Sequence, residues 1–157
     1  MILFLFAGCG ESGPVTFTPA GVFTSAFTMR QDDHSFSGEV ACRGADDITL
    51  TFSEPAGVRG VEVRYVPGGL TVTVGDKTET VCEGELPGGA PIELLLAGLR
   101  QFCFCEQRAD KNENGTSESS GTVGGVLLTA VYDETGRLCS VSDNNGFAAA
   151  FIDAGTD

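Results

Sequence analysis

Alternating hydrophobic and polar positions recur along the chain and predict short β-strands. Over residues 48–53, hydrophobic side chains alternate with threonine and serine, and the same period of two returns over 61–65 and 70–74. Residues 78–82 predict a short partner strand. Since successive side chains of a strand point to opposite faces, each run predicts a strand with one buried side. Within 35–43, the face so defined consists of Phe36, Gly38, Val40 and Cys42.

The C-terminal part continues this β pattern. Residues 123–132 and 138–142 predict a hairpin across the turn 133–136, where glycine ends the turn at a position that tolerates positive φ. Residues 147–152 predict the last strand. The segment 107–121 is polar and lacks an apolar period, so it predicts a mobile loop or the tip of a hairpin.

The first part of the chain is less clear. Residues 15–31 are rich in β formers but are broken by Pro19-Ala20-Gly21. Phe23 and Phe27 are four residues apart, which leaves a helical turn open. Threonine content and the alternation of Phe27 with Met29 favour a strand at the end of this segment.

One segment has helical spacing. Over 92–106, apolar residues recur every three or four positions, and Pro91 suits the first turn of a helix. Gly98 weakens the helix. The apolar face is formed by Ile92, Leu95, Leu96, Leu99, Phe102 and Cys103.

The predicted order is about five strands, one helix, and two or three further strands. This is an α+β fold, mainly antiparallel β, in which a curved, unclosed, barrel-like sheet packs one main helix on its concave face. A helix of this size is about 22 Å long, at about 1.5 Å per residue, and covers only part of a sheet of about seven or eight strands. The uncovered concave strip is a candidate site for a lipid or other apolar ligand, unless the same residues simply pack together as core. Its candidate lining residues are Phe36, Leu50, Phe52, Val63, Tyr65, Val72, Leu95, Leu99, Phe102 and Phe151.

Charge excludes one class of partner. Of 157 residues, 22 are acidic and 9 are lysine or arginine, so the net charge is −13. This charge repels phosphate backbones, so we expect no nucleic-acid partner. It also repels an anionic lipid surface, so membrane attachment calls for a covalent anchor.

The N-terminus resembles the lipobox of bacterial lipoprotein signal peptides. The apolar run MILFLF is followed by Ala7, Gly8 and Cys9, and then by a polar stretch that includes Glu11. Phe6 departs from the usual residue of the motif, and no lysine or arginine precedes the run; a start codon placed too far downstream would explain the missing charge. The alternative is a buried first strand.

The lipobox resemblance implies lipidation of Cys9. Residues 1–14 would then be signal, anchor and linker, and 15–157 a single domain. The protein would be extracytoplasmic and anchored in a membrane, at the cell surface or in the periplasm. Apart from that run, no segment approaches a transmembrane span of about 20 apolar residues.

Catalytic chemistry has little support in the sequence. His34 is the one histidine and lies in an expected turn, and the chain has no GxSxG motif, so we expect no enzyme. Residues 110–115 (DKNENG) match the start of an EF-hand loop, but the twelfth position is Gly121 where a bidentate glutamate is needed. We therefore expect a solvated loop there, with no metal and no cofactor.

The cysteines leave several pairings open. If Cys9 is lipidated, an odd number remains, and the CxC spacing of Cys103 and Cys105 indicates neither a zinc ribbon nor a thioredoxin-like motif. We expect small buried apolar cysteines, with room for one disulfide. The expected buried set is Cys42, Cys82, Cys103 and Cys139.

The stretch ITLTFSEPAGVRGVEVRYVPGGLTVTVGDKTETV (48–81) resembles the repeated strand pattern of the outer-membrane lipoprotein carrier (LolA-like) family. The opening with Phe23 and Phe27, the helix after the loop 84–91, and the hairpin LLTAVYDETGRLCSV (127–141) are similar to the same family. The resemblance implies an unclosed antiparallel barrel around a helix, with an apolar cavity for acyl chains and no catalytic residue. The chain is short for that family, whose soluble carrier has no lipid anchor, so we expect an anchored relative that binds an apolar ligand. The rival hypothesis is an anchored β-sandwich adhesion or interaction module without a cavity.

Overall fold

The computed structural model describes residues 13–82, 85 and 90–152. These residues form twelve strands, one α-helix and one short 3-10 turn. The predicted anchor residue Cys9 lies outside the described residues. The elements, in chain order, are β1 Val15–Phe17, β2 Phe23–Gln31, β3 His34–Gly44, β4 Asp47–Glu54, η1 Ala56–Val58, β5 Glu62–Val66, β6 Gly69–Val74, β7 Lys77–Cys82, α1 Pro91–Phe104, β8 Gln107–Lys111, β9 Ser117–Val123, β10 Val126–Tyr132, β11 Leu138–Ser142 and β12 Phe147–Ile152.

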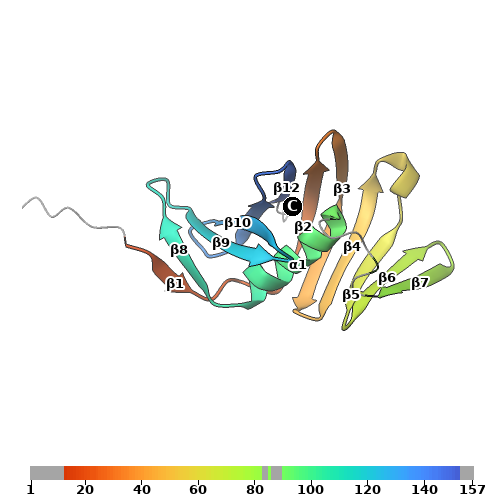
Figure 1. The fold of residues 1–157 in the computed structure, drawn as a ribbon, viewed down its shortest axis with the longest axis horizontal. Helices are drawn as coiled ribbons and strands as arrows, with labels where there is room; N and C mark the ends of the chain where they lie inside the picture. The colour runs from red at the N-terminus through yellow and green to blue at the C-terminus, as the bar shows by residue number, and fades with distance from the viewer. Residues whose placement is uncertain (1–12, 83–84, 86–89, 153–157) are drawn as a thin grey trace, which may run out of the picture.

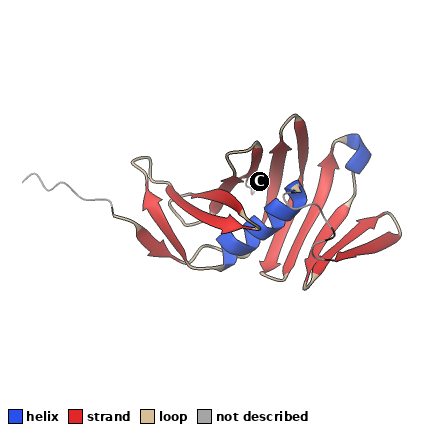
Figure 2. Cartoon of the chain, viewed as in Figure 1, coloured by secondary structure: helices blue, strands red, loops and turns tan. Residues whose placement is uncertain are grey.

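All twelve strands belong to one sheet. Their order is β1-β8-β9-β10-β11-β12-β2-β3-β4-β5-β6-β7, and every pair is antiparallel. The sheet is curved and unclosed, with β1 and β7 at its two ends, and α1 lies across its middle (Figures 1 and 2). The predicted fold class is therefore confirmed. The rival sandwich hypothesis required two packed sheets, whereas the described strands form a single sheet.

The predicted strand count was too low. Seven strands precede α1 and five follow it, where the sequence predicted about five and then two or three. The main reason is the polar segment 107–121, which forms β8 and most of β9 in place of a mobile loop, with only its tip at 112–116 outside the strands.

Buried polar side chains explain how this segment forms strands without an apolar period. Gln107 and Ser119 are buried, and the Ser119 hydroxyl donates to Gln107 Oε1 over 3.0 Å. The Gln107 amide nitrogen in turn donates to the carbonyls of Gln101 and Cys105 at 2.9 and 3.0 Å. Because these polar groups satisfy one another, the segment buries one side with Ala109 as its only buried hydrophobic residue in β8.

The helix was predicted well. It begins at Pro91 and ends at Phe104, two residues before the predicted end, because Cys105 is already extended. Its buried face packs against the core of the sheet, and the Tyr132 hydroxyl donates to the carbonyl of Phe102 over 2.9 Å. A side-chain Cβ at Gly98 would lie only 3.2 Å from Val141, so glycine here lets α1 approach β11 closely.

The segment around Phe23 is a strand throughout, so the helical turn that the sequence left open is not formed. Along β2, Ser25, Phe27 and Met29 point to the buried side, and Phe23 is half-buried on the same side. The Ser25 hydroxyl donates to the carbonyl of Ile152 over 2.5 Å.

Candidate functional site

The candidate site is the inner face of β5 and β6, the side of the sheet that carries α1. The strands are paired so that Val63 lies opposite Val72 and Tyr65 opposite Leu70. Side chains two residues apart share a face, so this pairing gathers hydrophobic residues on one side. We call this set the inner surface; it consists of Val61, Val63, Tyr65, Leu70, Val72 and Val74.

Burial of the inner surface decreases towards the end of β6. Val63 is 2% and Leu70 is 9% exposed, Tyr65 and Val72 are half-buried, and Val74 is 57% exposed. Figure 1 shows the reason: α1 lies over the middle of the sheet, and β5, β6 and β7 extend beyond it. The inner surface thus lies at the margin of the core, and its apolar side chains become more exposed with distance from the core.

Arg100 of α1 borders the inner surface. Its guanidinium carbon lies 4.3 Å from the centroid of the Tyr65 ring, a cation–π contact. The same side chain donates to the carbonyl of Ala45 over 3.1 Å and forms an ion pair of 3.3 Å with Asp46. Arg100 therefore joins the helix to β5 and to the turn between β3 and β4.

The structure places all ten predicted ligand-binding residues on the core side, but most of them are fully enclosed. Phe36, Tyr65 and Val72 are half-buried at the margin of the core. Within the described part of the chain, a ligand therefore has access to these three rather than to the enclosed ones. The seven enclosed residues are Leu50, Phe52, Val63, Leu95, Leu99, Phe102 and Phe151.

Several of the ten residues contact one another. Leu50, Val63 and Val72 lie side by side across β4, β5 and β6. The rings of Phe36 and Phe52 are 6.1 Å apart at their centroids in an edge-to-face arrangement. Phe151 lies apart from this group and packs its ring against Phe23.

Sequence reasoning missed four residues in or beside the site, one of which, Leu70, belongs to the same alternating run as Val72. Val61 and Val74 continue the alternation of β5 and β6, so the period of two was a sufficient signal for both. Arg100 had no such signal, because its contact with Tyr65 joins positions on different elements.

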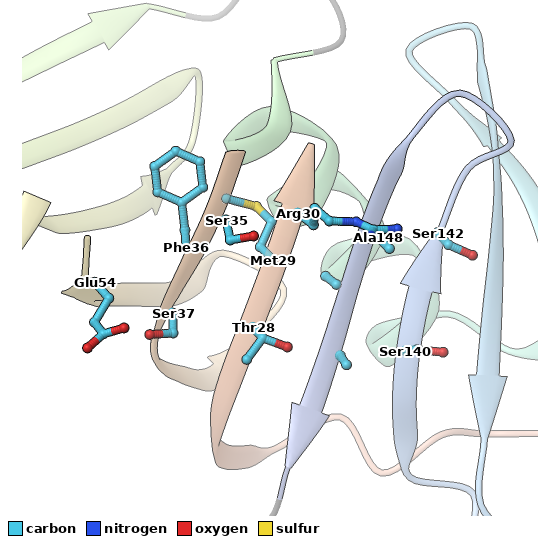
Figure 3. A pocket seen from close by; sticks show the side chains of 12 residues that line it. Thr28, Met29, Arg30, Ser35, Phe36, Ser37, Glu54, Ser140, Ser142 and Ala148 are labelled. Atoms are coloured by element: carbon cyan, nitrogen blue, oxygen red, sulfur yellow. The ribbon is translucent and has the colours of Figure 1, made fainter. Parts of the chain in front are cut away.

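A second hollow lies on the opposite, outer face of the sheet. It spans β11, β12, β2 and β3 and has a volume of about 670 Å³ (Figure 3). Its lining includes the short side chains of Ser140, Ser142, Ala148 and Ala150, together with Arg30, Glu54 and the predicted site residue Phe36. The hollow is open and mixed in polarity, so it lacks the continuous apolar character of the inner surface.

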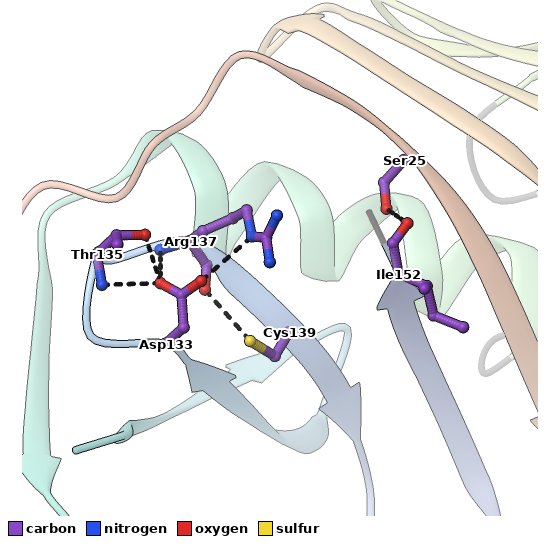
Figure 4. A network of polar contacts seen from close by, with 6 residues as sticks. All are labelled: Ser25, Asp133, Thr135, Arg137, Cys139 and Ile152. Atoms are coloured by element: carbon purple, nitrogen blue, oxygen red, sulfur yellow. Dashed lines mark hydrogen bonds and ion pairs between the residues drawn. The ribbon is translucent and has the colours of Figure 1, made fainter. Parts of the chain in front are cut away.

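A polar network organises the turn between β10 and β11 (Figure 4). One Asp133 carboxylate oxygen accepts hydrogen bonds from the backbone and hydroxyl of Thr135 and from the backbone of Arg137, and the other pairs with the Arg137 guanidinium at 3.3 Å. Partial burial opposes ionisation, but these bonds and the charge of Arg137 outweigh it and lower the pKa of Asp133. Gly136 has a φ of 81°, as the predicted turn requires.

The other candidate groups do not assemble into a site. His34 is exposed at the start of β3, and residues 112–115 form the tight turn between β8 and β9. No cluster of three or more histidine, cysteine or acidic residues suited to a metal occurs in the described ranges.

The cysteines divide into two groups. Cys42 and Cys103 are buried as predicted, whereas Cys82 is exposed and Cys139 only half-buried, so the prediction of burial was wrong for these two. Cys82 ends β7 at the margin of the sheet, and Cys139 alternates with the buried Leu138. Cys105 is exposed, and all five cysteines in the described ranges are free thiols.

Comparison with known proteins gives a likeness to solved structures but none to a described family or curated protein. No family model matches the chain, and no curated protein matches it. The crystal structure of a LolA superfamily protein from Nitrosomonas europaea aligns with a TM-score of 0.41 and 11% sequence identity, covering 91% of this chain and 86% of that one. No helix in the described part of this chain has the length and hydrophobicity to cross a membrane.

Proposed function

We propose that this protein binds an apolar ligand, a lipid or acyl chain, on the inner surface beside α1. The observation that carries the proposal is the graded exposure of that surface, from the enclosed Val63 to the open Val74. An apolar face that continues from the core into solvent is in contact with water. Covering it with an apolar molecule removes that surface from water and so lowers the free energy.

The border of the surface suits a ligand with one polar end. On β7, Val81 lies opposite Leu70, Glu79 opposite Val72 and Lys77 opposite Val74. The apolar character therefore ends in charged residues at the same end of β6 where exposure is greatest. An acyl chain lying along β6 would have its polar end beside these charges.

The proposal includes a lipid anchor on Cys9 and a place outside the cytoplasm. Support comes from the lipobox resemblance and from the net charge of −13, which disfavours electrostatic attachment to an anionic membrane. Ligand binding of this kind needs no catalytic group, so we propose a binding protein rather than an enzyme.

The test is binding of a fluorescent fatty acid to the wild type and to two matched variants. Val74→Glu places a charge on the exposed end of the inner surface, and Thr80→Glu places the same charge on the outer face of the neighbouring strand. We expect Val74→Glu to weaken binding by about tenfold or more, since an unpaired carboxylate opposes apolar contact, and Thr80→Glu to bind as the wild type does. Equal affinity of Val74→Glu and the wild type, or no binding by the wild type, would overturn the proposal.

A further inference from the structure

Two asparagine–glycine pairs lie in hairpin turns of the chain. Asn114 and Gly115 belong to the turn between β8 and β9, and Asn145 and Gly146 to the turn between β11 and β12. Both asparagines are exposed, and both glycines have a positive φ, of 88° and 103°. Because a glycine has no side chain to shield its backbone nitrogen, that nitrogen can reach the side-chain amide of the asparagine before it. The surroundings of each pair decide whether this approach leads to reaction.

Hydrogen bonds hold both reacting groups of the first pair. The side-chain oxygen of Asn114 accepts bonds from the backbone nitrogen and the hydroxyl of Thr116, at 3.1 and 2.7 Å. The backbone N–H of Gly115 donates to the carbonyl of Asn112 over 3.1 Å. Attack of the Gly115 nitrogen on the Asn114 side chain has to break these bonds first, so the fold protects this pair.

The second pair lies in a turn that leaves its reacting groups unbonded. One Asp143 carboxylate oxygen accepts bonds from the backbone nitrogens of Asn145 and Phe147, each over 2.8 Å. Within the described ranges, neither the Asn145 side chain nor the backbone N–H of Gly146 has a hydrogen-bond partner. The side-chain carbonyl carbon of Asn145 and the nitrogen that attacks it are therefore both free, in a turn whose backbone Asp143 holds in place.

We propose that Asn145 deamidates spontaneously in the folded protein and is its site of covalent ageing, whereas Asn114 is preserved. Asparagine is one of the chemically labile residues of proteins, and the two turns give the same dipeptide opposite environments. The inference depends neither on ligand binding nor on the lipid anchor.

The reaction needs only water. The backbone nitrogen of Gly146 gives up its proton to solvent and attacks Cγ of Asn145. An N–Cγ bond forms, the Cγ–Nδ2 bond breaks, and the leaving nitrogen takes up a proton and departs as ammonia, which leaves a cyclic imide. Water then opens either carbonyl of the imide and gives aspartate, or isoaspartate with the backbone running through the side chain. In total one water is consumed, one ammonia is released, and no electrons are transferred.

Conversion changes the turn in charge and in length. It adds a carboxylate beside Asp143 and near Asp32, whose own Oδ1 would lie 2.7 Å from a Cβ at Gly146 and whose backbone nitrogen donates to the Gly146 carbonyl over 3.2 Å. Isoaspartate also lengthens the backbone between Asp143 and Phe147, which is 1% exposed and begins β12. We therefore expect the start of β12 to loosen after conversion.

The test is incubation of the folded full chain at mildly alkaline pH, with peptide mapping by mass spectrometry over time. Deamidation is detected as the mass difference between a hydroxyl and an amino group, and isoaspartate as a separate chromatographic peak. We expect conversion at Asn145 to be at least about tenfold faster than at Asn114, because reaction at Asn114 costs the hydrogen bonds of Thr116 and Gly115. Equal rates, faster conversion at Asn114, or no conversion at Asn145 would overturn the proposal.

Denaturant separates the effect of the fold from that of the local sequence. In guanidinium chloride the protecting hydrogen bonds are lost, so we expect both pairs to convert at similar rates. A difference as large as that in the folded protein would show that the fold is not its cause.

Two variants assign the reaction to one residue and test the protection of the other. Asn145→Gln should keep the mass of its peptide, because the longer side chain closes the ring far more slowly; a mass gain that persists would move the reaction to Asn144 and overturn the proposal. Thr116→Ala removes the shorter hydrogen bond to Asn114. It should speed conversion at Asn114 and leave the rate at Asn145 unchanged, and an unchanged rate at Asn114 would contradict the protection.

Discussion

The guanidinium of Arg100 lies 4.3 Å from the centre of the Tyr65 ring, so a helix residue stacks on a strand residue of the inner surface. The same guanidinium reaches the turn between β3 and β4 through Ala45 and Asp46. This contact fixes the position of α1 relative to β5. It therefore also sets how much of Tyr65 remains open at the margin of the core.

Removing this contact should loosen the helix. We expect Arg100→Ala to lower the free energy of unfolding by about 1–2 kcal/mol, from loss of the cation–π contact and of the charged hydrogen bond to Ala45. Urea unfolding measures the change. Arg108→Ala, which removes an exposed arginine on β8, is the control and should change stability by less than about 0.5 kcal/mol. Equal effects of the two substitutions would show that Arg100 has no special role.

The charge of Asp133 should contribute stability only where the carboxylate is ionised. Its pKa is lowered in the folded state, so the contribution is fully present above the usual carboxyl pKa and is lost as pH falls through the lowered folded value. Asp133→Asn keeps an oxygen acceptor but removes the charge. We expect the variant to be less stable than the wild type at neutral pH and equally stable in strong acid.

Urea unfolding over a pH series tests this expectation, with Glu134→Gln, an exposed neighbour in the same turn, as the control. A stability difference for Asp133→Asn that stays constant across the series would mean that the charge is not the cause.

Space between α1 and the sheet should limit substitutions at Gly98. A Cβ there would lie 3.2 Å from a methyl group of Val141 and 3.4 Å from one of Leu128, both buried in the core. Alanine gains helix propensity that offsets this crowding, so Gly98→Ala should change the free energy of unfolding by less than about 1 kcal/mol. Gly98→Leu should cost about 2–3 kcal/mol or more, because the helix must move away from β10 and β11. Ala97→Leu, at a half-buried position, is the control and should lower the free energy of unfolding by less. A Gly98→Leu protein as stable as the wild type would contradict the close packing.

Lipidation predicts a specific dependence on Cys9. In a bacterial host, the wild type should partition into the membrane fraction and show a mass increase from diacylglycerol, and Cys9→Ser should lose both properties. Cys82→Ser, a change at an exposed cysteine of the folded domain, should retain both. Membrane association of Cys9→Ser equal to that of the wild type would exclude the anchor.

The fold was predictable to the extent that hydrophobic periodicity expresses it. The strands 48–53, 61–65 and 70–74 and the helix near 92–106 have clear periods, and the structure contains all of them. The strands β8 and β9 escaped prediction because Gln107 and Ser119 replace apolar contacts with hydrogen bonds to each other. A hydrogen bond between polar residues on two different strands produces no hydrophobic periodicity in the sequence of either strand.

The candidate site was predictable only in part. The alternation of hydrophobic and polar residues placed Leu50, Val63 and Val72 on the correct face of the sheet. It does not reveal which part of that face the helix covers. Burial depends on the position of α1 over the sheet, which is set by contacts such as that of Gly98 with β11 and that of Arg100 with Tyr65. For this reason the sequence did not separate the enclosed Val63 from the half-buried Val72.

Photo-crosslinking with a diazirine-bearing fatty acid shows whether an apolar ligand binds the inner surface of β5 and β6. Peptides that carry the label are identified by mass spectrometry, with excess unlabelled fatty acid as the competitor. If the ligand binds there, the label is concentrated in residues 61–74 and is reduced by the unlabelled competitor. Labelling concentrated in β11 and β12 around the outer hollow, or labelling that excess fatty acid does not reduce, would contradict it.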